Sequence, residues 1–202
     1  MKRLVDFYRN LFVQNIAWLK TTVKWFMASA VLGAVFFFIK PELLKTIVNA
    51  FTEKFGADPA LDFHLVIQIF LQNVQASAIA LFGGLLFGLG SILIVGINGF
   101  LLGFIIMSLF SGSHGNFAVS LGLALGGLVP HGIFELPAFL ISATLGLRLG
   151  LEWIGKNALG NRWKILKLNF IHSLIIIPVI ALILFLAALI EVYVSGRIVN
   201  NF

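Results

Sequence analysis

Long apolar runs separated by short polar stretches are the main pattern of this chain. A helix crosses the hydrocarbon core of a membrane with about 20 apolar residues. The apolar runs cover residues 22–39, 65–95, 100–110, 117–147 and 170–190. The pattern predicts an all-α, polytopic membrane helix bundle of about five spans, with a tight turn at 96–99 between the second and third.

The first 24 residues have a different pattern from these runs. Apolar side chains recur there at steps of three or four, with lysines and arginines between them. Such spacing is typical of an amphipathic helix that lies on a membrane surface. We therefore predict an interfacial helix at 1–24, followed by a transmembrane helical domain at 25–202. The first span ends at Lys40 and Pro41, where charge and proline coincide.

Two further segments carry most of the remaining charge. Residues 40–64 mix acids with lysines and predict a short amphipathic helix followed by a turn at 56–59, whereas residues 148–167 are mainly basic. Basic segments next to spans stay in the cytoplasm. With five spans, this rule puts the N-terminus and 148–167 in the cytoplasm of a cell-membrane protein. Residues 40–64 and the C-terminus then face outward.

Composition supports a membrane protein and excludes several other classes. Of 202 residues, 60% are hydrophobic and only 11% charged, so little chain remains for a soluble catalytic domain. The net charge of +6 comes from residues flanking the apolar runs, which fits lipid headgroups better than nucleic acid. The absence of cysteine excludes disulfides and thiolate sites.

The stretch from Pro130 to Pro137 places ionisable groups inside an apolar run. In a helix, His131 and Glu135 stand four residues apart on one face. Buried charge is expensive in a membrane, so such a pair is a proton relay, a ligand-binding pair or a polar clamp that fixes packing. Pro130 either kinks one long helix within 117–147 or separates a re-entrant half-helix from a span.

Catalysis finds little support in these residues. One histidine and one glutamate make an incomplete metal site, and the sequence has no paired-histidine metalloprotease motif, serine-hydrolase elbow or phosphate-binding loop. We therefore expect no catalytic residue, no metal and no cofactor, and a protein that is not an enzyme.

Other polar residues and several glycines complete the candidate set. Asn73 and Asn98 place amides at membrane depth, and Glu191 marks the outer end of the last span. Arg148 lies too far along the helix to bond Glu135 directly. Glycines four residues apart allow close helix packing. These pairs are Gly84 with Gly88, Gly99 with Gly103, Gly122 with Gly126, and Gly146 with Gly150.

Taken together, the chain resembles the stage II sporulation protein M family over about residues 65 to 195. The most specific part of the resemblance is the proline-histidine-glycine-x-x-glutamate core from Pro130 to Glu135. The other matching stretches are Gln72-Asn73, the glycines through Gly88, Asn98-Gly99 with Gly103, Gly146 to Gly150, and Ala188 to Glu191. Gln72 departs mildly from a common Asn-Asn pair.

The resemblance implies a multi-span membrane protein without known enzymatic activity. The namesake of the family works with two cell-wall partners, a lytic transglycosylase and an amidase and endopeptidase, when the forespore is engulfed. We therefore expect a membrane scaffold that contacts the lipid bilayer, itself as a homo-oligomer, or cell-wall hydrolases and other envelope proteins. The alternative is a small channel or transporter, or the membrane subunit of an ATPase-driven exporter, in which His131 and Glu135 line a polar path.

Overall fold

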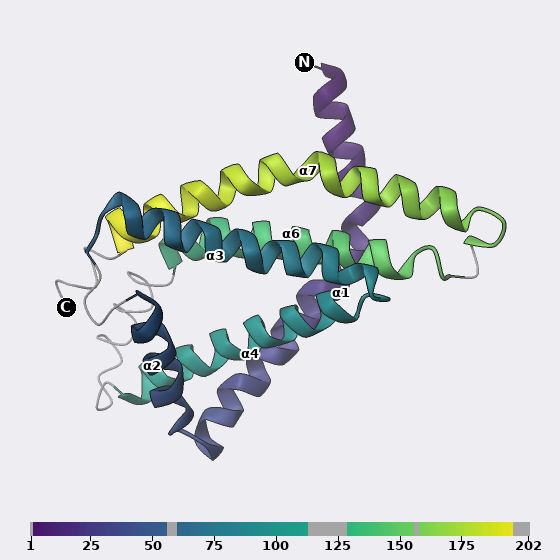
Figure 1. Cartoon of the computed structure of the whole chain (residues 1–202). Coiled ribbons are helices and arrows are strands. Elements are labelled where there is room, and N and C mark those ends of the chain that lie inside the picture. Colours follow the sequence, from purple (N-terminus) through teal and green to yellow (C-terminus); the bar gives the residue numbers. More distant parts are fainter. Residues whose placement is uncertain (1, 56–59, 113–128, 156–157, 196–202) are drawn as a thin grey trace.

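The structure is a computed structural model, and it describes residues 2–55, 60–112, 129–155 and 158–195. Nearly all of this part of the chain is helical. Figure 1 shows how the helices are arranged. They are α1 (Lys2–Ile39), α2 (Leu43–Phe55), α3 (Phe63–Phe82), the short 3-10 helix η1 (Gly83–Leu85), α4 (Leu89–Gly112), α6 (Val129–Leu151), α7 (Arg162–Ile190) and the π-helical turn η4 (Glu191–Ser195).

Five of the described helical stretches are long and apolar enough to cross a membrane. They are Val13–Ile39, Phe63–Leu85, Leu89–Ser111, Gly132–Leu151 and Arg162–Ser195. The expectation of an all-α polytopic bundle of five spans is confirmed, and the chain is a multi-pass membrane protein.

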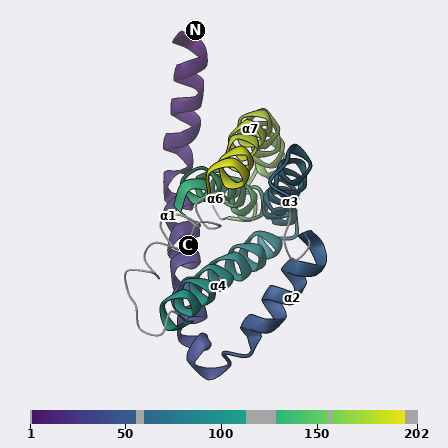
Figure 2. The same cartoon turned by 90° about the vertical axis from the view of Figure 1, so that its left-hand side faces the viewer.

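The spans form two groups that meet around α6. In Figures 1 and 2, α3, α6 and α7 lie together and α4 lies beneath them, whereas α1 runs from above α7 past these helices to the level of α4, against which it packs. α6 contacts α1, α3, α4 and α7. Within its span 56% of residues are buried, against 22–33% in the other four, so α6 is the central helix.

The turn between the second and third spans differs from the sequence prediction. We expected it at 96–99, but α4 runs unbroken through Asn98, and the chain reverses between Gly83 and Gly88. Phe87 and Gly88 have φ values of 53° and 76°, a left-handed conformation that ends a helix. Gly99, which we read as part of the turn, instead packs against the carbonyl oxygen of Phe26 in α1.

α1 is also longer than the sequence suggested. It continues from Lys2 to Ile39 without the boundary expected near residue 24, because no proline or glycine interrupts it before Gly33. The span begins at Val13 rather than at Thr22, and Leu11 and Asn15 are already buried. That the preceding residues lie on the membrane surface stays a prediction.

The fourth span begins close to the predicted break. Pro130 lies in the first turn of α6, where its missing N–H would have no partner in any case. Pro137 lies inside the helix, so the carbonyl of Ile133 loses its usual N–H donor. Residues 117–128 lie outside the described residues, and the choice between a kinked span and a re-entrant half-helix stays open there.

Glycines create the closest contacts between helices. A Cβ atom on Gly84 would collide with the carbonyl oxygen of Gly146, and one on Gly150 would collide with that of Gly84. A Cβ atom on Gly103 would likewise collide with the carbonyl oxygen of Ala30 in α1. Backbones therefore touch directly between η1 and α6 and between α1 and α4, a packing mode common in membranes. The pair Gly122 and Gly126 lies outside the described residues.

A substitution pair on α6 tests this packing. In Gly146→Ala the new methyl group would meet the carbonyl of Ala80 and the hydroxyl of Ser91. The turn between α3 and α4 must therefore move away from α6. We expect the free energy of unfolding in mixed micelles to fall by about 1–3 kcal/mol. Gly132→Ala, on the same helix, meets nothing within 4 Å and should be neutral or slightly stabilising. Equal effects of the two substitutions would contradict this account.

Candidate functional site

A pocket between α1, α4 and α6 brings together two of the predicted polar residues, Asn98 and Glu135. Its volume is about 200 Å³. α4 and α6 each contribute residues at helical spacing, so one face of each helix lines the pocket. The lining residues are Phe26, Asn98, Leu101, Leu102, Ile105, Gly132, Glu135, Leu136 and Phe139.

The pocket is apolar apart from these two groups. The side-chain amide of Asn98 donates a hydrogen bond to the carbonyl oxygen of Ile94 at 2.8 Å, which satisfies it within its own helix and leaves its carbonyl oxygen as an acceptor. Glu135 is half-buried, and the buried rings of Phe26 and Phe139 form part of the wall. The arrangement can hold a small, mostly apolar molecule or chain with one polar or cationic group.

His131 lies one helical turn before Glu135 in α6. This is the spacing at which two side chains share a face. The side chain of His131 lies outside the described residues, so the predicted pairing with Glu135 stays a prediction.

A second polar cluster lies at the other end of α6, around Arg148. Arg148 is 8% exposed, and its Nε lies 2.7 Å from Oε2 of Glu152. Asn169 of α7 donates its side-chain amide to the same carboxylate oxygen at 2.7 Å. Arg148 Nη1 also donates to Oδ1 of Asn15 in α1 at 3.2 Å. The cluster therefore ties α1, α6 and α7 together.

The remaining contacts of this cluster extend the link to α1. Asn15 donates its amide to the carbonyl of Leu11 at 2.7 Å, so both ends of this side chain are bonded. Two turns further along α1, the hydroxyl groups of Thr22 and Thr144 lie 3.2 Å apart. α1 is thus joined to α6 by polar bonds as well as by packing.

Sequence reasoning named Arg148 but missed its partners. It assigned 148–167 to an aqueous or interfacial segment, whereas Arg148 is buried between helices. The spacing of Arg148 and Glu152 predicts an ion pair on one helix. Asn15 and Asn169 give no such signal, because only the fold brings them to Arg148.

In the described contacts, Asn73 and Glu191 belong neither to the Asn98–Glu135 pocket nor to the Arg148 cluster. The amide nitrogen of Asn73 in α3 is buried and finds no hydrogen-bond partner among the described residues. Glu191 begins the η4 turn and is half-buried. Within the described residues, no group of three or more histidines and carboxylates could hold a metal ion.

The profile of one protein family, stage II sporulation protein M, matches residues 22–196 of the chain. The chain belongs to this family. The match takes in α6 with Glu135 and Arg148, but it starts after Asn15 and the beginning of α1.

A family relative comes from Methanocaldococcus jannaschii. This uncharacterized protein, MJ0793, is 32% identical over 168 residues, which cover 83% of the present chain and 89% of the relative. No solved structure matches the chain. This relative therefore supports the family assignment but supplies no activity for comparison.

The Arg148 cluster can be tested with a double-mutant cycle. Arg148→Met leaves the Glu152 carboxylate without its cation, and we expect the free energy of unfolding to fall by about 1–3 kcal/mol. Glu152 keeps 35% of its side chain exposed, which limits the loss. Adding Glu152→Gln should recover part of it, because the orphaned charge is removed. Strictly additive effects of the two substitutions would show that the pair is not coupled.

Proposed function

We propose that this member of the stage II sporulation protein M family is a non-enzymatic membrane scaffold that assembles with envelope or cell-wall-remodelling proteins. The observation that carries the proposal is the N-terminal arm, residues 2–10 of α1. This arm extends past the edge of the bundle formed by the other helices (Figures 1 and 2). A helix that projects from its own bundle offers a surface to a partner or to the membrane.

The arm is held in a fixed direction relative to the bundle. It continues without a break into the part of α1 that is bonded to Arg148 through Asn15 and packed against α4 through Gly99 and Gly103. A projection with this support presents the same surface in every copy, which suits assembly.

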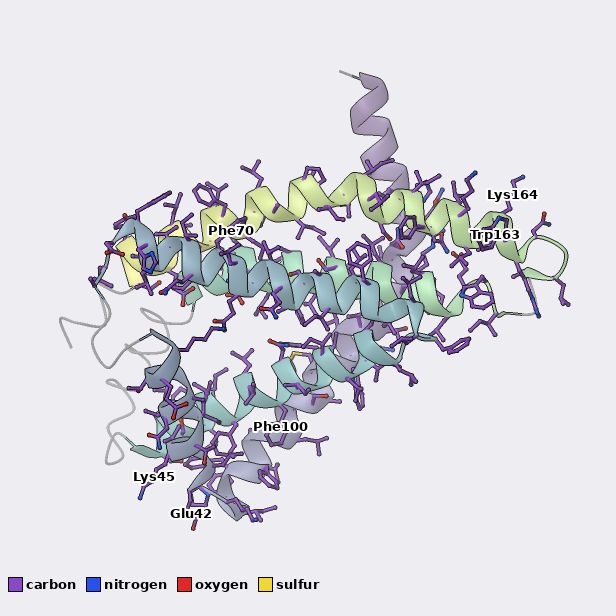
Figure 3. The ribbon with its side chains drawn as sticks, in the orientation of Figure 1. Glu42, Lys45, Phe70, Phe100, Trp163 and Lys164 are labelled. Carbon is purple, nitrogen blue, oxygen red and sulfur yellow. The ribbon has the colours of Figure 1, made fainter. Side chains whose placement is uncertain are left out.

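Charge supports the proposed orientation. Basic residues occur near the start of α1, among them Arg9, and at the start of α7, where Trp163 and Lys164 lie at the opposite end of the molecule from Glu42 and Lys45 (Figure 3). In a five-span topology the starts of the first and the fifth span face the same side of the membrane. The positive-inside rule then places the N-terminus in the cytoplasm and the C-terminus outside.

Site-specific photocrosslinking tests the scaffold proposal. A photoreactive amino acid at Arg9, which is exposed, should give protein adducts of defined mass in the native membrane. These adducts include a second copy of the chain if the scaffold self-associates. The matched control is Leu182 on α7, which is 60% exposed and should yield mainly lipid adducts. Lipid adducts alone at both positions would refute assembly through the arm.

A specific observation also favours a second candidate function, a channel, a transporter or the membrane subunit of an exporter. The Asn98–Glu135 pocket reaches an ionisable residue within a membrane span, close to the proline at the start of α6. Intramembrane carboxylates near discontinuous helices are typical of transport sites.

Glu135→Gln separates the two functions, because glutamine keeps the shape of the side chain but cannot carry its charge. Transport predicts loss of ion or proton flux in liposomes with an unchanged assembly state. Scaffolding predicts instead a lower thermal stability or a looser assembly, with no flux in the wild-type protein to lose. The control is Glu42→Gln, which makes the same chemical change at an exposed position and should alter none of these readouts.

A further inference from the structure

α2 has a clear apolar side and a clear polar side. Along its sequence, Leu44, Ile47, Val48, Phe51 and Phe55 recur at steps of three and four, the spacing of one helical face. Lys45, Asn49 and Glu53 fall on other positions and are exposed. At 13 residues the helix is too short to cross a membrane, so it lies on one side of the bilayer.

Its connections fix α2 at the level of the membrane surface. Only Lys40, Pro41 and Glu42 separate it from the end of the first span, and residues 56–62 join it to the start of the second. Both of those span ends lie at the same face of the bilayer. Figures 1 and 2 show α2 passing across the ends of the bundle helices rather than running alongside them.

The described residues leave part of the apolar side of α2 uncovered. α2 has no extensive contact with any other element in the described part of the chain. Val48, at one edge of the apolar face, is 51% exposed, whereas Leu44 and Ile47 are partly buried. Glu42 and Lys45 point away from the bundle (Figure 3).

We propose that α2 is an interfacial anchor whose apolar face lies in the lipid surface of the bilayer, at the boundary between headgroups and acyl chains. An amphipathic helix at this depth gains from burying apolar side chains while its polar face stays in water. A protein partner is less well supported, because the position of the face at a span end already brings it to lipid. This inference is independent of the proposed scaffold function.

The charges of α2 add a second expectation. Lys40, Lys45 and Lys54 outnumber Glu42 and Glu53 by one, so the helix and its first connecting residues carry a net charge of only +1. Apolar burial rather than attraction to anionic lipid then holds α2 at the membrane. Its depth should therefore be the same in vesicles of neutral lipid and in vesicles that also contain anionic lipid.

The absence of cysteine in the natural chain allows a direct test. Val48→Cys and Asn49→Cys each introduce a single thiol into the full-length protein, which is labelled with an environment-sensitive fluorophore and reconstituted in phosphatidylcholine vesicles. At position 48 we expect blue-shifted emission, strong quenching by lipids that carry a shallow nitroxide, and iodide quenching several-fold weaker than at position 49, which is exposed and lies outside the apolar face. Adding phosphatidylglycerol should leave these values unchanged.

Two outcomes would overturn the proposal. Equal iodide quenching at 49 and 48 would show that the apolar face lies in water. Protection of position 48 without lipid quenching would show that protein covers it, and loss of that protection on dilution into more lipid would identify a second copy. Because Val48 is exposed, its substitution should not disturb the fold, and an unchanged unfolding curve verifies this.

Discussion

Direct contact between helix backbones is the constraint on which this structure depends. Lipid chains are as apolar as leucine, so membrane helices gain little by hiding apolar side chains from them, and close packing must hold the bundle together. Here the carbonyl oxygens of Gly84, Gly146 and Ala30 occupy the space that a Cβ atom would need on a facing glycine. These contacts fix η1, at the end of the second span, against α6 and α1 against α4. The polar groups of the bundle are placed relative to them.

The polar clusters add specificity to that packing. Thioether or aliphatic side chains of similar size could fill the space of Arg148 and Glu152, but they would not select the partners that the pair selects on α1 and α7. Asn15 and Asn169 each present an amide to the pair, so a rotation of either helix would leave a buried charge without its bond. We infer that the cluster sets the rotation of α1 about its axis, and with it which face of the N-terminal arm is turned outward.

The sequence predicts what depends on local pattern and fails where tertiary contacts decide. Apolar runs and the positions of Pro41 and Pro130 give the number of spans, the α2 segment and the start of α6, because these follow from length and from missing N–H groups. The turn between the second and third spans was misplaced because Gly83–Gly90 and Gly96–Gly99 look alike in sequence. Only the fold shows that the chain reverses at Gly83–Gly90, whereas Gly99 packs against α1. Likewise, helical spacing predicts that Arg148 pairs with Glu152, but nothing in the sequence pairs Arg148 with Asn15, which is 133 residues away from it along the chain.

The central position of α6 bears on the choice between a scaffold and a transporter. α6 carries residues of both polar clusters and contacts four other spans. It meets the second span through glycine-lined faces and α1 through polar bonds, and neither kind of contact leaves room for sliding. Alternating access needs one group of helices to rock against another around a central site. In this bundle such rocking would separate α6 from α1 and break the Asn15–Arg148 and Thr22–Thr144 bonds together. A helix fixed on both sides favours a static architecture, so the Asn98–Glu135 pocket fits a bound molecule or a fixed pore better than a moving gate.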